Sequence, residues 1–203
     1  MTDLRQRIAQ LDPERLELLL RLERPPAGSS AAPTIVPRED RSQAPLSFLQ
    51  RRLWFLDRLE AGSPLYNMHA AYRVRGGLDL RTLGASFAEA LRRHEVLRAR
   101  FEDDGGEPVQ RIEALAAVTL PLVDLAALPE ESQGAEAERL VLAAARWPFD
   151  LSRAPLLRVV LVRTAASDHR ISVALHHVVS DGWSIGVLIA EFEALYGAFA
   201  RGL

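Results

Sequence analysis

The last third of the chain contains the pattern that most restricts its fold: two apolar strands followed directly by an apolar helix. Residues 156–162 and 170–175 are rich in leucine and β-branched side chains, which favour buried strands. From Ile185 to Phe199, apolar residues recur at helical spacing. His176 and His177 stand at the junction between strand and helix. Because side chains at such a junction are held by rigid elements and can still face a cleft, we predict a functional site there.

The order of the remaining elements predicts an α/β fold with a mixed or largely antiparallel sheet packed with helices. Asp103–Gly106 is a hairpin signal, and the sequence shows neither a glycine-rich phosphate loop nor a parallel Rossmann alternation. Ser47 and Gln50 form a capping box before an aromatic-rich helix, which is predicted to be buried on two sides. The predicted helices are 47–59, 80–94, 130–146 and 184–200, and the predicted strands are 68–75, 97–102, 109–112, 118–122, 156–163 and 169–175.

Composition divides the chain into three segments. Residues 1–24 form a predicted helical lead-in, whose leucine-rich second half must be covered by its own domain or by another chain. Residues 25–45 hold five of the twelve prolines and are a predicted linker. Residues 46–203 are then predicted to form one folded unit, which is long enough to bury a sizeable core.

The overall composition excludes several classes of protein. The absence of cysteine rules out disulfides, thiolate metal sites and a cysteine nucleophile. A net charge of −2 gives no general affinity for nucleic acid or for an anionic membrane. No apolar run approaches the roughly 18 residues of a membrane span, and no signal peptide is evident, so a cytoplasmic protein is expected. All 25 basic residues are arginine, which we interpret as the composition bias of a GC-rich bacterial genome.

Four explanations for the paired histidines can be weighed from the residues alone. Adjacent strand residues point to opposite faces, so His176 and His177 have different roles, and either could be only a buried structural histidine. A zinc or iron site would need further His or Cys ligands, but the other three histidines are scattered. A serine nucleophile would need an elbow such as Gly-x-Ser-x-Gly, which is absent. General-base chemistry fits best, because histidine titrates near neutrality and the following helix N-terminus can stabilise an oxyanion.

Three stretches resemble the core motifs of one family. The run His176–Gly182 (HHVVSDG) is similar to the HHxxxDG signature of condensation domains of nonribosomal peptide synthetases. Its shorter HxxxDG core also occurs in chloramphenicol acetyltransferase and in other acyl-CoA-dependent acyltransferases. Ser47–Leu56 (SFLQRRLWFL) and Arg93–Phe101 (RHEVLRARF) resemble the first and second core motifs of the condensation domains. All three occur in the family's order and spacing.

The resemblance implies a chloramphenicol acetyltransferase-like lobe. Residues 46–203 would be the N-terminal lobe of a condensation domain whose C-terminal lobe is absent, so the chain is expected to be inactive alone. Residues 1–24 resemble the short lead-ins of some synthetase subunits, and they could dock on an upstream synthetase subunit.

The resemblance also assigns roles around the signature. His177 is the counterpart of the family's catalytic histidine, and His176 would be structural. Gly182 would lie close to the reacting thioester, where a side chain would obstruct. Within this family the motif's aspartate pairs with an arginine.

Asp181 is the matching aspartate, and the second motif supplies its expected partner. The resemblance points to Arg93 for this ion pair, with Arg98 as a supporting charge. A buried carboxylate needs such a partner, and the pair would fix the loop that aims the catalytic histidine.

The implied reaction is amide bond formation in secondary metabolite biosynthesis. A donor acyl or peptidyl thioester on the phosphopantetheine of one peptidyl carrier domain is attacked by the amine of an aminoacyl thioester on an acceptor carrier domain. The expected partners are these two carrier domains and the adenylation domain of the same synthetase, with no cofactor or metal bound directly. Two alternatives stay open: a non-catalytic docking or binding fragment, and a CoA-dependent acyltransferase of the HxxxDG superfamily.

Overall fold

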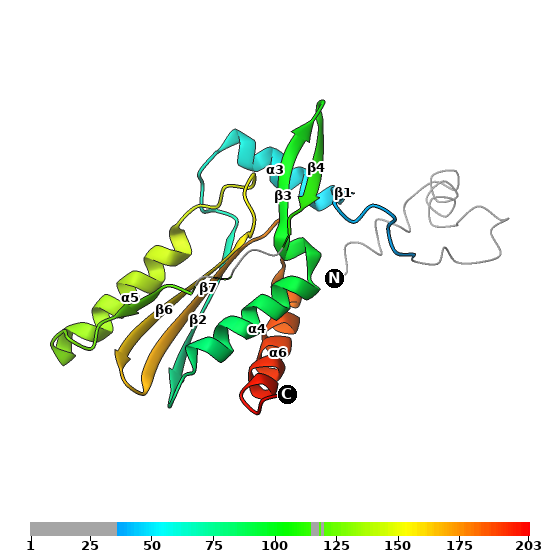
Figure 1. The fold of residues 1–203 in the computed structure, drawn as a ribbon. Helices are drawn as coiled ribbons and strands as arrows, with labels where there is room; N and C mark the ends of the chain where they lie inside the picture. Colours follow the sequence, from blue (N-terminus) through cyan, green and yellow to red (C-terminus); the bar gives the residue numbers. More distant parts are fainter. Residues whose placement is uncertain (1–35, 115–117, 119) are drawn as a thin grey trace, which may run out of the picture. The chain divides into compact units, whose positions relative to one another are not determined.

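The computed structural model describes residues 36–114, 118 and 120–203, and Figure 1 shows their arrangement. The chain divides into two compact units, Met1–Glu39 and Asp40–Leu203, and the second unit contains every element described below. The predicted lead-in at 1–24 and most of the predicted linker lie outside the described residues. Within the described ranges, no helix is long and apolar enough to cross a membrane.

A four-stranded sheet in the order β2-β7-β6-β5 forms the centre of the larger unit. The pairs β2–β7 and β6–β7 are antiparallel, whereas β5–β6 is parallel, so the sheet is mixed and largely antiparallel as predicted. The strands are β2 (Asn67–Arg75), β5 (Leu122–Asp124), β6 (Leu157–Ala165) and β7 (Asp168–His176).

Helices cover both faces of this sheet. In Figure 1, α5 (Glu130–Arg146) lies on one face, and α4 (Leu80–Arg93) and α6 (Gly182–Phe199) lie on the other. Strand β6 contains a continuous apolar run, Val159–Val162, whose side chains enter both layers: Val159 and Leu161 join the core with α4, while Val162 packs with α5. Burial on both faces therefore explains the continuous apolar run in the sequence.

A second, smaller sheet has the order β1-β4-β3. Strands β3 (Ala99–Asp104) and β4 (Glu107–Ile112) are the predicted hairpin, and β3 extends two residues into its predicted turn. Only Gly105 and Gly106 remain between them, both with positive φ, which suits a two-residue turn. Strand β1 (Gln43–Pro45) pairs with β4, which corrects the prediction that these three residues end a linker: their backbone groups complete a sheet edge.

Helix α3 (Phe48–Leu59) begins at the predicted capping box. The Ser47 hydroxyl accepts from the backbone N–H of Gln50, and the Gln50 side chain accepts from the backbone N–H of Ser47. The prediction that this helix is buried on two sides is wrong for the described chain: none of its residues is buried, and Phe48 is 84% exposed. Only Leu53 and Trp54 pack against the core from this helix.

The predicted strand at 118–122 is misplaced. The strand that pairs with the outer edge of β6 begins instead at Leu122, directly after Pro121, whose carbonyl accepts from the backbone N–H of Leu161. Proline has no N–H to donate to a ladder, so it is well placed just before the strand.

The C-terminal end of α5 is closed by a side chain from the sheet. The Arg158 guanidinium donates to the carbonyls of Trp147 (2.9 Å) and Pro148 (3.2 Å), and it lies 4.4 Å above the ring of Phe149. A cation that hydrogen-bonds the last carbonyls of a helix satisfies acceptors that have no partner within the helix. Burial lowers the pKa of Arg158 from its ordinary value.

We expect Arg158→Lys to lower the free energy of unfolding by about 1–3 kcal/mol, because an ammonium group cannot reproduce the planar fork or the stacking of a guanidinium. The matched control is Arg139→Lys in the exposed Arg139–Glu136 pair of α5, which should change stability by less than about 0.5 kcal/mol. Urea unfolding of the two variants measures the difference, and equal stabilities would contradict the assignment.

Candidate active site

The predicted site is the turn between β7 and α6. Strand β7 ends at His176, and α6 begins at Gly182 with Asp181 as its N-cap. The two histidines face different surroundings, as strand alternation predicts: His176 is 1% exposed, whereas His177 is exposed. The predicted difference in role is therefore reflected in their environments.

His176 lies in the core. Its Nδ1 accepts a hydrogen bond from the backbone N–H of Val178 at 3.1 Å, and the rings of Tyr66 and Phe149 pack edge-on with centroids at 6.3 Å. Burial, with a smaller contribution from the charge of His177, lowers the pKa of His176 to about 4. A neutral, enclosed imidazole of this kind supports the turn and is poorly placed to meet a substrate.

The ring of His177 has a defined tautomer. Its Nδ1 lies 2.7 Å from the carbonyl oxygen of Ser180, and because a carbonyl can only accept, Nδ1 must carry the hydrogen. The backbone N–H of His177 donates to the carbonyl of Tyr66 at 2.9 Å, which ties the residue to the segment before β2. Among the described residues, Nε2 has no hydrogen-bond partner, so its lone pair remains free to accept a proton or a substrate N–H.

His177 lines a cavity of about 590 Å³ between α3 and the turn. On one side the cavity is lined by α3 residues such as Gln50 and Leu53, and on the other by residues 177–181, with Tyr66 between them. The first and third sequence motifs therefore meet at one cavity, although nearly 130 positions separate Gln50 from Val178. The N-terminus of α6 opens beside the same cavity, because Asp181 and Ser184 also line it.

Asp181 caps α6. One of its carboxylate oxygens accepts from the backbone N–H of Ser184 at 2.7 Å and from the Ser184 hydroxyl at 2.8 Å, while the Ser184 hydroxyl also accepts from the backbone N–H of Asp181. The hydrogen bonds that the carboxylate accepts from Ser184 are the main cause of the lowered pKa of Asp181. The residue is exposed, so it does not need a buried counter-ion.

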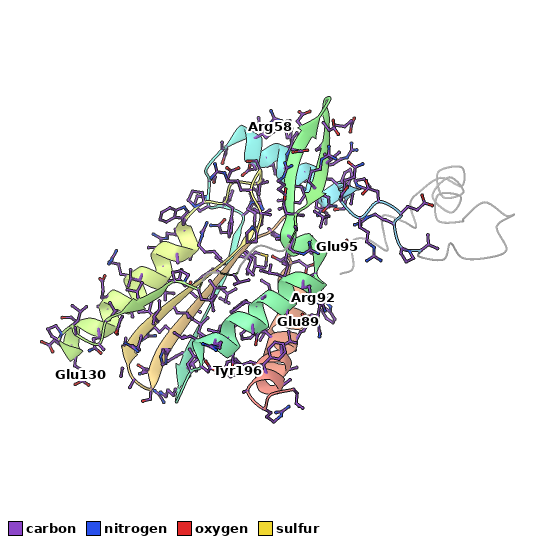
Figure 2. The ribbon with its side chains drawn as sticks, in the orientation of Figure 1. Arg58, Glu89, Arg92, Glu95, Glu130 and Tyr196 are labelled. Carbon is purple, nitrogen blue, oxygen red and sulfur yellow. The ribbon has the colours of Figure 1, made fainter. Side chains whose placement is uncertain are left out.

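The predicted Asp181–Arg93 ion pair is not present. Arg93 instead bridges Glu89 at 2.7 Å and Glu191 of α6 at 2.9 Å, and His94 also contacts Glu191 at 2.5 Å. Figure 2 labels Glu89 and Arg92 on α4. The correction has a local cause: Ser184 is three residues from Asp181 and satisfies it, while the end of α4 meets α6 more than two turns further along.

The other two predicted supporting residues have different surroundings. Arg98 donates to the carbonyl of Leu91 at 2.8 Å and to that of Glu113, so it ties the end of α4 to the end of the hairpin rather than to the turn. Gly182 has no positive φ, and an added Cβ would meet no atom of the described chain within 4 Å. Within the described chain nothing therefore requires a glycine at position 182, and its expected closeness to the thioester stays a prediction.

We expect Asp181→Ala to lower the free energy of unfolding by about 1 kcal/mol, which is the usual cost of losing an N-cap. In a double-mutant cycle, Asp181→Ala and Arg93→Ala should be additive within about 0.5 kcal/mol, since the two side chains share no contact. A coupling energy above about 1 kcal/mol between the two substitutions, measured by urea unfolding, would show that Asp181 and Arg93 do interact and would contradict this finding.

Two contributions to the site were not identified from the sequence. Gln50 was recognised as part of a capping box and of the first motif, but not for the hydrogen bond of its side chain to the carbonyl of Val178 at 3.1 Å. Tyr66 contributes a backbone carbonyl, for which a sequence carries no signal. In the part of the chain that the structure describes, no group of three His, Asp or Glu residues could hold a metal ion.

Comparison with known proteins identifies the family. Residues 40–202 match the family model of the condensation domain. Chondramide synthase cmdD of Chondromyces crocatus is 46% identical over 170 residues, which are 84% of this chain and 4% of that protein. Phosphinothricin tripeptide synthetase PhsC of Streptomyces viridochromogenes is 42% identical over 203 residues, 100% of this chain and 19% of that protein. The chain therefore spans less than a fifth of either relative.

Solved structures confirm the fold. The starter condensation domain of rhizomide synthetase RzmA matches with a TM-score of 0.72 at 24% identity, over 79% of this chain and 38% of that chain. The first condensation domain of the calcium-dependent antibiotic synthetase matches with a TM-score of 0.70 at 23% identity, over 79% of this chain and 38% of that chain. With its sequence match and this fold, the chain belongs to the condensation domain family of nonribosomal peptide synthetases.

Proposed function

We propose that this chain supplies the catalytic histidine of a condensation domain that forms an amide bond between two carrier-bound thioesters. The observation that carries the proposal is the His177 ring, held as the Nδ1–H tautomer by Ser180 and lining a cavity beside the N-terminus of α6. The donor is an acyl or peptidyl thioester, and the acceptor is the α-amine of an aminoacyl thioester. Both are carried on phosphopantetheine arms of peptidyl carrier domains, so the chain itself needs no cofactor.

The free Nε2 of His177 can act on the attacking amine. An α-amino group has an ordinary pKa of roughly 7.7–8.0, so much of it is already neutral near pH 8 and needs no base to become nucleophilic. Its nitrogen becomes acidic as the tetrahedral intermediate forms, and Nε2 can then accept that proton. Before this step, the same lone pair can accept an N–H hydrogen bond and hold the amine in line.

The N-terminus of α6 can stabilise the negative charge that develops on the thioester oxygen. When the amine attacks, the thioester oxygen becomes negative, and the positive end of the α6 dipole stabilises an anion. Asp181 occupies the cap and places a carboxylate close to this end, although its hydrogen bonds are directed to Ser184. Loss of the thiolate leaving group then completes the amide.

The second wall of the site is proposed to come from the other lobe of the domain, so the 203 residues alone are expected to be inactive. The solved condensation domains are longer than this chain, which covers 38% of each of the two compared above. Apolar side chains on the site's side of the chain also lack cover among the described residues: Trp183 at the start of α6 is 84% exposed, and Leu49 of α3 is 66% exposed. We place the reaction in the bacterial cytoplasm, with the adenylation domain of the same synthetase loading the acceptor carrier and residues 1–24 available for docking an upstream subunit.

A CoA-dependent acyl transfer is a second candidate. A mutant of the starter condensation domain of rhizomide synthetase RzmA, which shares this fold, has been crystallised in complex with C8-CoA. The same histidine geometry would serve a CoA thioester donor, because the reacting carbonyl is the same.

The test uses the complete synthetase subunit with its carrier domains loaded. A donor thioester is offered either on the upstream carrier or on CoA, and the mass of the acceptor carrier is followed by intact mass spectrometry. The proposal expects the acceptor carrier to gain the donor acyl group from the carrier-bound donor. Acyl gain from CoA alone would favour the second candidate, and loaded carriers without any transfer would contradict both.

A further inference from the structure

The orientation of the His177 ring depends on the short backbone turn that follows it. The carbonyl that accepts its Nδ1–H belongs to Ser180, three residues along the chain, so the ring and its partner move together only if the peptides between them are fixed. The backbone N–H groups of Val178 and Val179 are held by His176. These bonds all lie within the turn itself, so they leave its position relative to α3 undetermined.

Gln50 connects the turn to α3. Its Nε2 donates to the carbonyl of Val178 at 3.1 Å, and this is the hydrogen bond through which a described side chain of α3 reaches the turn. The two ends of the Gln50 amide have separate tasks, because Oε1 accepts from the backbone N–H of Ser47 at 2.9 Å and thereby caps α3. Gln50 and His177 line the same cavity, so this contact lies at the wall that a substrate would meet.

The bonded carbonyl is well placed to control the ring. Val178 directly follows His177, so its carbonyl lies in the backbone between the imidazole and the Ser180 oxygen that accepts from it. If the Val178 peptide rotates, the position of Ser180 relative to the ring changes, and the Nδ1–H tautomer loses its partner. Free imidazole side chains prefer the Nε2–H tautomer, which would leave Nε2 without a lone pair.

We propose that Gln50 is a positioning residue for His177: its amide donor holds the Val178 carbonyl, and through it the tautomer that leaves Nε2 free. The inference rests on the proposed function for its catalytic meaning, but the tautomer itself is a property of this chain. This role differs from helix capping, because the cap uses Oε1 as an acceptor for the Ser47 N–H, whereas the Val178 carbonyl is bound by Nε2.

The substitution Gln50→Glu separates the two roles. Glutamate keeps an oxygen for the Ser47 N–H, and Glu is a regular N3 partner in a capping box, but it has no N–H for Val178 and puts a carboxylate oxygen against a carbonyl. The matched control is Gln133→Glu, because the Gln133 amide also donates to a backbone carbonyl, that of Leu128, at 3.0 Å. Gln133 lies in the first turn of α5, whose labelled Glu130 end lies far from α3 in Figure 2.

The readout is the ¹⁵N chemical shifts of the His177 ring, measured on the 203-residue chain at about pH 9, where imidazole is neutral. The five histidines of the chain keep the spectrum simple, and His177→Asn assigns the resonance. In Gln50→Glu the ratio of the Nδ1–H to the Nε2–H tautomer is expected to fall about fivefold, as for the loss of one neutral hydrogen bond. Gln133→Glu should leave the ratio unchanged.

Three outcomes decide the matter. A fall in Gln50→Glu with an unchanged melting temperature supports the proposal. If the glutamate variant melts early, Gln50→Met, which lacks the donor without adding a charge, must show the same fall. An unchanged ratio in a folded Gln50→Glu chain would overturn the proposal, whatever its activity in the complete synthetase. The function could fail separately, if removal of His177 left amide formation intact.

Discussion

Replacing His177 with alanine in the complete condensation domain is expected to lower the rate of amide formation by roughly 10²–10⁴-fold. The reason is the free Nε2: alanine removes both the acceptor for the ammonium proton of the intermediate and the hydrogen bond that would orient the amine. Because the residue is exposed and its backbone N–H contact with Tyr66 persists in alanine, the fold should remain intact. The measurement is single-turnover formation of the product on the acceptor carrier, with loading of both carriers verified first.

A matched histidine provides the control. His69 on β2 is also exposed and contacts Ser172 at 3.0 Å, but it lies outside the cavity that His177 lines. His69→Ala should therefore retain a rate within about twofold of the parent, since uninvolved surface substitutions have small effects. Wild-type rates in His177→Ala, or equal losses in both variants, would rule out His177 as the catalytic residue.

A glutamine at position 177 can separate the two possible roles. Its side-chain amide can accept a hydrogen bond from the amine but cannot take a proton near neutral pH. If His177→Gln recovers most of the rate lost in alanine, then positioning of the amine is the main contribution. If glutamine is as slow as alanine, then proton transfer is the main contribution.

Local features around the candidate site could be predicted from the sequence where short-range rules apply. The capping box of Ser47 and Gln50 forms as expected because its partners are three residues apart. His176 and His177 have different surroundings, as strand alternation predicted, although β7 ends at His176 and His177 begins the turn; their different roles stay a prediction. The apolar run at 156–162 predicted a buried strand, and the structure shows that both faces of β6 are covered.

Long-range pairings could not be predicted in the same way. Arg93 was assigned to Asp181 because both belong to recognised motifs, yet its long-range partner is Glu191, which is set by how α4 crosses α6. The polar residue spacing of a helix does not encode where a neighbouring helix will meet it. Aromatic content likewise predicted a buried α3, but burial depends on which neighbours cover a side chain, and Phe48 and Phe55 remain exposed in the described chain.

The buried His176 should make the chain sensitive to mild acid. Its pKa is lowered to about 4 in the folded chain, chiefly by burial, whereas an unfolded histidine titrates near 6.5. The unfolded chain therefore binds more protons between these two values. Stability is fully present above about pH 6.5 and is lost as the pH falls towards about 4. Between about pH 7.5 and about pH 5, this one group is expected to lower the free energy of unfolding by about 2 kcal/mol.

His176→Asn isolates this contribution. The Asn Oδ1 can take the place of Nδ1 and accept from the backbone N–H of Val178, but it does not titrate. The variant should be destabilised at about pH 7.5, because a smaller side chain leaves a cavity, yet it should lose about 2 kcal/mol less than the parent on going to about pH 5. Urea unfolding followed by tryptophan fluorescence at the two pH values gives both numbers.

Other titrating groups have little influence on this difference. Glu89, Asp124 and Asp168 have pKa values lowered to about 2 by their arginine partners, so their protonation matters mainly below the ordinary carboxyl range. Burial also lowers the pKa of His69, and that contribution is common to the parent and the variant. Val159→Ala supplies the control for packing, since it opens a cavity in the same core and should lower stability equally at both pH values. A parent chain with the same free energy of unfolding at both pH values would contradict the lowered pKa of His176.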